Sequence, residues 1–339
     1  MSRVRIAING FGRIGRTIAR IAKSQNKFDL VAVNDLTDPE YLAYALKYDS
    51  THGIYPGKIA VEGNGIRIDR DVVKVLAEPK PENLPWKELK IDYVIESTGI
   101  FRKIAQVEQH LSAGAKRVIV SVPLKDECPA TIVMGVNDDL LNKDIRVISN
   151  ASCTTNCAAP LAKIIHEAFG IERGLMNTVH AYTADQRLLD APHSDFRRSR
   201  SAAENIVPTS TGAARTVGKV YPPLKGKLDG FAIRVPVSDG SIVDLTLHLS
   251  KAVTVEEINA EVKRRAQEDF MGVVSVAEAP LVSCDIVGNP HSCIFDPDLT
   301  RVIDGNFVKV VAWYDNEFGY SSRMVDLIEK LADMDGLSI

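Results

Sequence analysis

Cys153 lies in a strongly polar segment, and its thiol is a candidate nucleophile. The segment Ser149-Asn150-Ala151-Ser152-Cys153-Thr154-Thr155-Asn156-Cys157 follows a short apolar run and opens a stretch with helical periodicity. In the first turn of a helix, the helix dipole favours a thiolate. An unperturbed thiol is only about 3% ionised at pH 7, and lowering its pKa to about 6 requires about 3.4 kcal/mol. A helix end supplies about 1 kcal/mol of this, so the sequence predicts a basic partner.

His180 is the best candidate for that partner. It follows the expected strand 176–179, and a neutral imidazole can take the thiol proton as a general base. The alternative is that a single cysteine is a small buried apolar residue. That alternative fits Cys157, one helical turn later, better than it fits Cys153. The other three cysteines have no metal-ligand spacing, so no metal site is expected.

The glycine pattern Gly10-Phe11-Gly12-Arg13-Ile14-Gly15 is a candidate dinucleotide site. It follows the expected strand 4–9 and opens a helix, and Asp35 ends the next expected strand about 20 residues later. The glycines would let the backbone approach a pyrophosphate at the helix N-terminus, and the acid would bind the ribose hydroxyls. Because a carboxylate there repels a 2′-phosphate, NAD is favoured over NADP. The alternative is an ordinary strand–helix turn with a surface aspartate.

Two further segments have the residue types of an anion site. The run Thr209-Ser210-Thr211-Gly212-Ala213-Ala214 is rich in hydroxyl groups and glycine, as a phosphate cradle would be, although a helix cap has the same composition. Arg234 lies within the apolar strand 232–236, where a guanidinium group must find an anion. Its planar donors match phosphate oxygens, so the sequence predicts an anion beside Arg234.

The pattern of apolar residues indicates how these groups are positioned. Short apolar runs alternate with helical periodicity in the first part of the chain, which predicts βαβ units and an α/β fold with a doubly wound, mostly parallel sheet. After Ser149 the strands become longer, which predicts an α+β domain with a mixed or antiparallel sheet. The expected domains are residues 1–151, residues 152–318 and a C-terminal helix within 319–339.

Composition limits the class of protein and its partners. The 339 residues are 45% hydrophobic and 25% charged, which is typical of a globular protein. A net charge of −3 provides no field to attract nucleic acid or an anionic membrane. No apolar run approaches the roughly 18 residues of a membrane span, and the start lacks the features of a signal peptide. Five cysteines are an odd number, so reduced thiols in a cytoplasmic protein are expected.

Several segments, in order over essentially the whole chain, resemble the phosphorylating glyceraldehyde-3-phosphate dehydrogenases. Besides the nonapeptide around Cys153, which is specific to this family and its close relatives, they are Ile8-Asn9-Gly10-Phe11-Gly12-Arg13-Ile14-Gly15, His180-Ala181-Tyr182-Thr183-Ala184-Asp185-Gln186, residues 208–214 and Trp313-Tyr314-Asp315-Asn316-Glu317-Phe318-Gly319-Tyr320. The resemblance implies that Cys153 attacks the aldehyde of glyceraldehyde 3-phosphate with His180 as the base. It also implies that hydride passes to NAD and that inorganic phosphate then releases 1,3-bisphosphoglycerate.

The resemblance also implies roles for other residues. The substrate and phosphate contacts would be Ser152, Thr154, Thr183, Asp185, Arg198, Thr211, Gly212 and Arg234. The cofactor contacts would be Gly10, Gly12, Arg13, Ile14, Gly15, Asp35, Ser121 and Asn316. The loop 180–205 is similar to the family's S-shaped loop, which reaches a neighbouring subunit's cofactor site in a homotetramer. The last helix is similar to one that packs back on the NAD-binding domain.

Two positions depart from the family pattern. Ala191-Pro192 stands where a bulkier residue often precedes the proline, and small residues there accompany NADP use in photosynthetic relatives. Some tolerance of NADP therefore stays open despite Asp35. Pro79 stands where an arginine or lysine often lies near the adenine, which leaves that contact unassigned.

Two alternative functions remain. Erythrose-4-phosphate dehydrogenase shares the cysteine and the histidine, but that branch has Glu where Asp35 stands and Val where Thr209 stands, so the triose phosphate is favoured. A non-catalytic RNA- or partner-binding protein could reuse the same fold. The near-balanced charge, together with an intact nucleophile, base and set of anion anchors, favours catalysis instead.

Overall fold

The structure is a computed structural model that describes residues 3–339, and it divides into two compact units. Unit 1 contains the chain up to Ile132, together with Asp139–Ala151 and Ser321–Ile339. Unit 2 contains Val133–Asp138 and Ser152–Tyr320. The chain therefore leaves unit 1 and returns to it for its last helix.

Unit 1 is built on a mostly parallel sheet. Its strands are β1 (Arg5–Asn9), β2 (Asp29–Asn34), β5 (Ile59–Glu62), β6 (Gly65–Ile68), β7 (Asp71–Leu76), β8 (Tyr93–Glu96), β9 (Arg117–Val120), β10 (Ala130–Thr131) and β11 (Val147–Ser149). The strand order is β10-β11-β9-β8-β1-β2-β7-β6-β5, and all pairs from β10 to β7 are parallel. The order β7-β2-β1-β8-β9-β11 is that of a doubly wound dinucleotide fold, which confirms the predicted class.

The longer helices of unit 1 each bury one apolar face. In α1, the residues Ile18, Ile21 and Ala22 are buried, as their spacing predicts. The side chain of Asp38 caps α2 by accepting from the backbone N–H of Tyr41 at 2.9 Å. The helices are α1 (Arg13–Gln25), α2 (Pro39–Lys47), α3 (Ile104–Val107) and α4 (Gln109–Ser112), and a small hairpin joins β3 (Tyr48–Asp49) to β4 (Gly53–Ile54).

The C-terminal helix α8 (Phe318–Asp335) completes unit 1. At its end, Asp335 accepts from the Tyr93 hydroxyl at 2.7 Å and forms two hydrogen bonds with the buried guanidinium of Arg117. Although partial burial raises the pKa of Asp335, the hydrogen bonds from Arg117 and Tyr93 lower it below its ordinary value. These bonds fix the end of the chain to strands β8 and β9.

Asp335→Asn is expected to lower the free energy of unfolding by about 1.5–3 kcal/mol at pH 7, because it removes the charge that pairs with Arg117. Since the folded-state pKa is depressed, this stabilisation is present above the unfolded value of about 4 and is lost as pH falls through the folded value. Urea unfolding of the wild type and of Asp335→Asn should therefore give free energies of unfolding whose difference becomes smaller as the pH is lowered. A difference that stays constant down to pH 3 would contradict this assignment.

Unit 2 is built on a mixed sheet, as predicted. Its strands are β12 (Ile171–Ala181), β13 (Val207–Ser210), β14 (Leu228–Val235), β15 (Ser241–Leu249), β16 (Val274–Val276), β17 (Cys293–Phe295), β18 (Arg301–Ile303) and β19 (Phe307–Tyr314). The order is β13-β14-β12-β15-β19-β17-β16, with β18 beside β19. The pairs β12–β14 and β16–β17 are parallel, and the other pairs are antiparallel.

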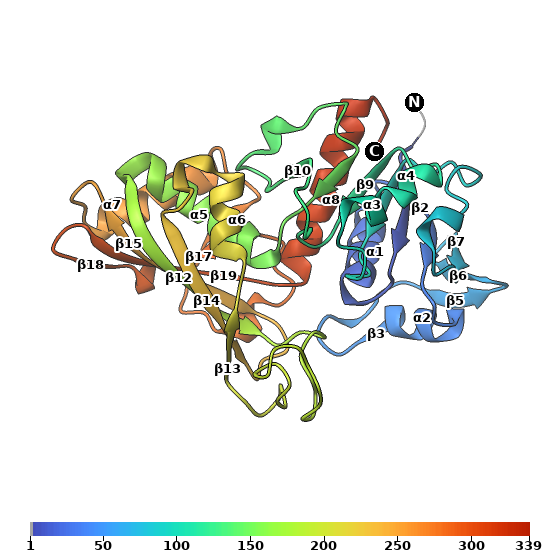
Figure 1. Cartoon of the computed structure of the whole chain (residues 1–339), viewed down its shortest axis with the longest axis horizontal. Helices are drawn as coiled ribbons and strands as arrows, with labels where there is room; N and C mark the ends of the chain where they lie inside the picture. The colour runs from blue at the N-terminus through green and yellow to red at the C-terminus, as the bar shows by residue number, and fades with distance from the viewer. Residues whose placement is uncertain (1–2) are drawn as a thin grey trace. The chain divides into compact units, whose positions relative to one another are not determined.

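Three helices lie together on one face of this sheet (Figure 1). They are α5 (Cys153–Phe169), α6 (Ala213–Val220) and α7 (Val255–Gln267). The start of α7 is a capping box, in which Thr254 and Glu257 bond reciprocally to each other's backbone N–H. No helix formed by residues 3–339 is both long and apolar enough to cross a membrane.

Some elements differ from the sequence prediction. The spacing of apolar residues over 107–113 predicts one helix, but the structure has the two short helices α3 and α4. The acidic start after Thr254 predicts a helix to residue 270, but α7 ends at Gln267. The predicted strand 232–236 ends at Val235, because Pro236 has no N–H to continue the ladder. The antiparallel strands β5 and β6 were not predicted. Single-turn 3-10 helices occur at Pro81–Asn83, Asp138–Leu140, Pro222–Leu224, Ser283–Ile286 and Pro297–Leu299.

Candidate active site

Cys153 is the first residue of α5, as predicted. Ser152 caps the helix, and its hydroxyl accepts from the backbone N–H of Thr155 at 3.1 Å. The preceding residue, Ala151, has a left-handed φ of 54°. For a residue with a Cβ this conformation costs about 1–3 kcal/mol, and such strain is concentrated at functional sites. The turn places the sulfur at the N-terminal end of the helix, where it is only partly exposed.

The structure places His180 beside Cys153, as the sequence predicts. Sγ of Cys153 lies 3.4 Å from Nε2 of His180, and the imidazole is buried. On the other side of the ring, Nδ1 is 2.7 Å from the carbonyl oxygen of Ala181 and 2.9 Å from Nη1 of Arg234. When Nδ1 carries the proton and donates to Ala181, Nε2 presents its lone pair to the sulfur. The ring can therefore take the thiol proton.

Strand register brings these side chains together. His180 on β12 pairs directly with Arg234 on β14, and Arg234 pairs with Val207 on β13, so all three lie on one face of the sheet. Thr178, two residues before His180, shares that face and bonds to the hydroxyl of Tyr314 at 2.9 Å. The pairing of three strands, rather than the chain sequence, therefore assembles the base and the arginine.

Burial disfavours the charged forms of both Cys153 and His180. It raises the pKa of the Cys153 thiol, while Arg234 and hydrogen bonds from Thr154 lower it less. Burial and the positive charge of Arg234 lower the pKa of His180 to about 3. The raised pKa of the thiol contradicts the low thiol pKa that the sequence predicts, because desolvation outweighs the charge of Arg234 and the hydrogen bonds of Thr154. Before substrate binds, the structure favours a neutral thiol beside a neutral imidazole.

Proton transfer within the pair is nevertheless assisted. Moving the proton from Sγ to Nε2 creates two opposite charges 3.4 Å apart. At an effective dielectric constant of about 20, their attraction is about 5 kcal/mol. The thiolate and the imidazolium are thus far less costly to form together than separately. The arrangement suits a thiol that is ionised as it attacks.

Arg234 has the features expected of an anion anchor. Its Nη1 donates to the Ala181 carbonyl at 3.0 Å. Its buried Nε has no acceptor among residues 3–339. A buried donor without a partner is unfavourable, so an oxyanion at this position would satisfy it. This observation supports the predicted anion site.

Arg198 is held firmly by its neighbours. It donates to a carboxylate oxygen of Asp185, to Thr209 Oγ1 at 2.9 Å and to the Ser210 carbonyl at 3.0 Å. Burial raises the pKa of Asp185, but the bond to Arg198 lowers it below its ordinary value. Thr183 precedes Asp185 by two residues, and its carbonyl accepts from the N–H of Gln186 at 2.9 Å. The structure therefore brings Arg198 and Asp185 together, with Thr209 as a third member.

The other predicted phosphate residues lie at two helix starts. Ser152 caps α5, and Gly212 precedes α6 with open space where a Cβ would lie. Thr211 Oγ1 accepts from the N–H of Ala213 at 3.2 Å. Thr154 differs from the expectation, because its hydroxyl is buried against the Tyr314 hydroxyl at 2.9 Å. Thr154 also lowers the pKa of the Cys153 thiol, although by less than burial raises it.

The glycines of the first loop have three different structural roles. Gly10 has a φ of 91°, and a Cβ there would lie 2.5 Å from the backbone nitrogen of Thr98. A Cβ on Gly15 would lie 2.2 Å from the Gly10 carbonyl oxygen, so helix α1 could not pack so closely. Gly12 has no atom within 4 Å of such a Cβ and is exposed at the helix start. The loop thus leaves open backbone for a pyrophosphate.

Asp35 is oriented toward this loop. Its carboxylate accepts from the backbone N–H of Phe11 at 2.8 Å and of Thr37 at 3.1 Å. Arg13 makes two hydrogen bonds to Asp49, at 2.9 and 3.1 Å, so its guanidinium is held beside the start of α1. Ile14 is half-buried in the first turn of that helix. These contacts fit a dinucleotide held at the carboxyl ends of β1 and β2.

The remaining predicted cofactor residues lie in different units. Ser121 follows β9 in unit 1 and is largely buried, with its N–H bonded to the Glu96 carbonyl at 2.9 Å. Asn316 follows β19 in unit 2, and its side-chain oxygen accepts from the Ser241 hydroxyl at 2.6 Å. Asn316 is thus held within unit 2 by Ser241.

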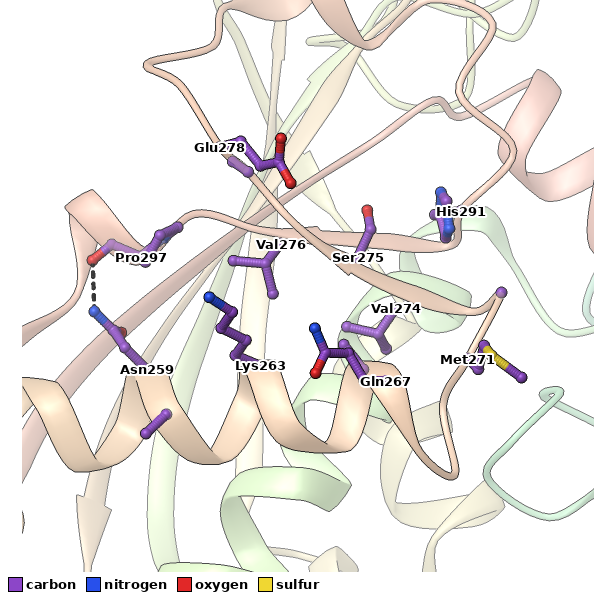
Figure 2. Close-up of a pocket in the computed structure, with 14 residues that line it drawn as sticks. Asn259, Lys263, Gln267, Met271, Val274, Ser275, Val276, Glu278, His291 and Pro297 are labelled. Atoms are coloured by element: carbon purple, nitrogen blue, oxygen red, sulfur yellow. Dashed lines mark hydrogen bonds between the residues drawn. The ribbon is translucent and has the colours of Figure 1, made fainter.

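A groove of about 660 Å³ lies elsewhere in unit 2, between α7 and strand β16 (Figure 2). None of the predicted site residues lines it. Asn259 on its wall donates to the Pro297 carbonyl at 3.1 Å. The groove is therefore separate from the residues around Cys153.

Sequence reasoning missed Tyr314 as a site residue. Its ring lies edge-on to His180 with centroids 5.8 Å apart, and its hydroxyl joins Thr154 to Thr178. Burial raises the pKa of Tyr314 well above its ordinary range, so the hydroxyl stays neutral beside the thiol. In the sequence, Tyr314 is a tyrosine at the end of an apolar strand. This pattern is too common to mark Tyr314 as a site residue.

Comparisons with known proteins agree with this geometry. The family description "Glyceraldehyde 3-phosphate dehydrogenase, NAD binding domain" matches residues 4–104, and the description of the C-terminal domain matches residues 152–316. The chain is 56% identical over 336 residues to glyceraldehyde-3-phosphate dehydrogenase of Borreliella burgdorferi, covering 97% of this chain and 99% of that protein. It is 54% identical over 330 residues to the enzyme of that name from Geobacillus stearothermophilus, covering 97% and 98%. It is 52% identical over 332 residues to glyceraldehyde-3-phosphate dehydrogenase 1 of Bacillus subtilis, again covering 97% and 98%. A chain that matches these proteins along nearly its whole length belongs to the glyceraldehyde-3-phosphate dehydrogenase family.

Proposed function

We propose that this protein is a phosphorylating glyceraldehyde-3-phosphate dehydrogenase of glycolysis and gluconeogenesis. It oxidises D-glyceraldehyde 3-phosphate to 1,3-bisphosphoglycerate with NAD and inorganic phosphate. The observation that carries this proposal is the 3.4 Å approach of Cys153 Sγ to His180 Nε2, beside the unsatisfied Nε of Arg234. A nucleophile, a base and an anion anchor at one place are what acyl transfer to phosphate requires.

Cys153 carries the covalent chemistry. Its sulfur attacks the aldehyde carbon to form a thiohemiacetal, and Nε2 of His180 takes the thiol proton. Protonated His180 gives this proton to the former carbonyl oxygen, which becomes the hydroxyl of the thiohemiacetal, and His180 accepts it again as the carbon is oxidised. NAD supplies the hydride acceptor for this step. The resulting thioester is cleaved when a phosphate oxygen attacks its carbonyl carbon and Cys153 leaves as the thiolate.

Two groups of residues would hold the two phosphates. Arg198, aimed by Asp185 and aided by Thr183, would bind the phosphate of the substrate, with Arg234 shared between the two sites. The attacking phosphate would lie at the helix starts formed by Ser152, Thr154, Thr211 and Gly212. Open space beside Gly212 and the free Nε of Arg234 support this assignment. Thr154 would contribute its position next to the sulfur rather than a free hydroxyl.

The cofactor is NAD. Its pyrophosphate would lie along the backbone of Gly10, Gly12 and Gly15 at the start of α1, near Arg13 and Ile14. Asp35, held by the N–H of Phe11, would accept from the ribose hydroxyls and repel a 2′-phosphate. Ser121 and Asn316 would complete the contacts. On this assignment, residues 1–151 with the C-terminal helix 319–339 form the NAD-binding domain, and residues 152–318 form the catalytic domain.

The function is tested by a steady-state assay with two aldehydes and two cofactors, with and without phosphate. We expect NADH to form from glyceraldehyde 3-phosphate at a rate that depends on phosphate, with kcat/KM at least about tenfold higher for NAD than for NADP. That ratio corresponds to about 1.4 kcal/mol of discrimination by Asp35. A preference for erythrose 4-phosphate would support the alternative dehydrogenase. Absence of any aldehyde oxidation would support a binding protein.

We also propose that the protein is a homotetramer that works in the cytoplasm, where glycolysis takes place. The face of the unit 2 sheet that carries Leu175, Phe231 and Phe307 leaves these large apolar side chains exposed. The loop after β12 likewise exposes Leu188, Leu189 and Phe196. Exposed apolar groups of this size are typical of an interface between subunits.

Light scattering should therefore give a mass near four times 37.1 kDa. Phe231→Asp is expected to shift the protein to smaller species, because it places a charge in the interface. Met271→Asp is the matched control, since Met271 is exposed beside the groove of Figure 2 and should leave the mass unchanged. A wild-type protein with the mass of one chain would contradict the proposal.

A further inference from the structure

We propose that Glu96 is a positioning residue for the cofactor, acting through a buried polar ladder across the carboxyl ends of three parallel strands. The ladder consists of Asn34, Asn9 and Glu96, which are the last residues of β2, β1 and β8. All three are at least 94% buried. The inference rests on the proposed binding of NAD at the loops that follow these strands.

The ladder is continuous. Asn34 Nδ2 donates to Asn9 Oδ1 at 2.7 Å, and Asn9 Nδ2 donates to Glu96 Oε2 at 2.6 Å. The three residues are adjacent because β2 pairs with β1 and β1 pairs with β8 in matching register. In a doubly wound sheet, ligands bind just beyond these strand ends. The ladder therefore forms the floor beneath the proposed cofactor site.

Glu96 is fixed as the acceptor of four hydrogen bonds. Besides Asn9, His110 Nε2 bonds to Oε2 at 3.1 Å, and the N–H and the hydroxyl of Thr98 both donate to Oε1. The indole N–H of Trp86 can only donate, and it points at His110 Nδ1 at 3.0 Å. His110 must therefore carry its proton on Nε2 and donate it to Glu96. Trp86 and His110 are fully buried, so this end of the ladder is anchored in the core.

The ladder holds the loops that would contact the cofactor. Thr98 is bound directly by Glu96, and its backbone nitrogen lies against Gly10 so closely that a Cβ on Gly10 would come within 2.5 Å. The Ser97 hydroxyl donates to the Gly10 carbonyl at 2.7 Å. At the other end, Asn34 exchanges two hydrogen bonds with the backbone of Glu78, each at 2.9 Å. One buried carboxylate thus sets the spacing between the glycine loop and the loop after β8.

A fully buried carboxylate is costly, and apolar residues of similar volume would stabilise the sheet at least as well. Glu96 accepts hydrogen bonds from the end of β1, from α4 and from the loop after β8. Only a carboxylate offers acceptors on both oxygens, which explains why an acidic residue occupies this position. A glutamine of the same shape would place an NH2 group against either Thr98 or the Asn9–His110 pair, since every neighbour donates. Glu96→Gln should therefore displace one loop while changing volume very little.

The test compares Glu96→Gln with Tyr93→Phe. Tyr93 lies on the same strand, and its substitution removes the hydrogen bond to Asp335, so it weakens the same unit without touching the ladder. We expect Glu96→Gln to raise the KM and the Kd for NAD by about 10- to 100-fold, with kcat at saturating NAD within about threefold of wild type. Tyr93→Phe should lower thermal stability and leave the KM for NAD unchanged. If Glu96→Gln only destabilised the fold, a smaller fraction of the enzyme would be active. The apparent kcat would then fall, and the KM for NAD would stay constant.

The other possible results of this experiment also decide whether Glu96 positions the cofactor site. If Glu96→Gln binds NAD as tightly as wild type, Glu96 is a structural residue and the inference is overturned. If the wild-type protein does not bind NAD, the proposed function fails and the inference fails with it. If Glu96→Gln does not fold, Thr98→Val replaces it, because that change keeps the size of the side chain and removes the hydroxyl bond to Glu96, together with the bond that the hydroxyl accepts from the Ile100 N–H at 3.1 Å. It should raise the KM for NAD severalfold, and an unchanged KM would overturn the inference.

Discussion

Cys153→Ser is expected to lower phosphate-dependent NADH formation by at least about 10⁴-fold while leaving NAD binding unchanged. Serine keeps the size and the hydrogen bonds of the residue at the start of α5. Its hydroxyl, however, is far harder to ionise than a thiol and cannot form the thioester. Burial already raises the pKa of the group at this position, which makes the oxygen analogue still less reactive. The rate is followed by NADH absorbance, and the Kd for NAD by calorimetry.

Cys157→Ser is the matched control for this prediction. Cys157 lies one turn along the same helix, is fully buried, and points toward the carbonyl oxygens of Ala312 and Trp313 at 4.0 and 3.9 Å. The same chemical change there should reduce stability modestly and retain turnover. If the Cys153 variant kept more than a few per cent of the wild-type rate, another residue would have to be the nucleophile.

His180→Asn is expected to lower kcat by about 10²- to 10⁴-fold, the usual contribution of a general base. The amide of asparagine can occupy the place of Nδ1 beside Ala181 and Arg234, but it has no atom at the position of Nε2. Because burial and Arg234 lower the pKa of His180 to about 3, the wild-type imidazole is neutral over the whole working range. The acidic limb of the rate profile therefore belongs to the thiol, and activity should rise as pH increases through the thiol ionisation.

Alkylation of Cys153 by iodoacetamide as a function of pH checks this directly. In His180→Asn the thiol loses its proton acceptor, so the profile should move to higher pH and the rate at pH 7 should fall. His248→Asn is the control, since His248 lies on β15 and bonds to Glu172 at 2.9 Å, away from the site. Coincident profiles for wild type and His180→Asn would show that the imidazole does not assist ionisation.

The parts of this site that the sequence predicted are those set by local signals. The polar segment before α5 marks the helix start that carries Cys153, and the glycine pattern with Asp35 marks the turn between β1 and α1. His180 was found because a charge argument required a base and a histidine ended a strand. In each case the signal lies within a short segment, although the contact of Cys153 with His180 joins α5 to β12.

The parts that the sequence did not predict depend on tertiary packing. The charge state of Cys153 and His180 follows from burial beneath Tyr314 and from the facing Arg234, which come from two other strands. The ladder of Asn34, Asn9 and Glu96 exists only because three strand ends lie in register. Strands β5 and β6 have only four residues each, and β5 is largely exposed, so their apolar pattern gives little signal, although the turn Gly63-Asn64 between them is visible in the sequence.

The return of the last helix to unit 1 has a consequence for biosynthesis. A ribosome delivers the chain from the N-terminus, so every strand of the β12–β19 sheet emerges before the residues that pair with Arg117 and Tyr93. Every strand of unit 2 is therefore synthesised before Asp335 can dock, and unit 1 reaches its final form only after unit 2 has been made. A nascent chain that stops short of Asp335 would hold the complete thiol half and an unfinished nucleotide half.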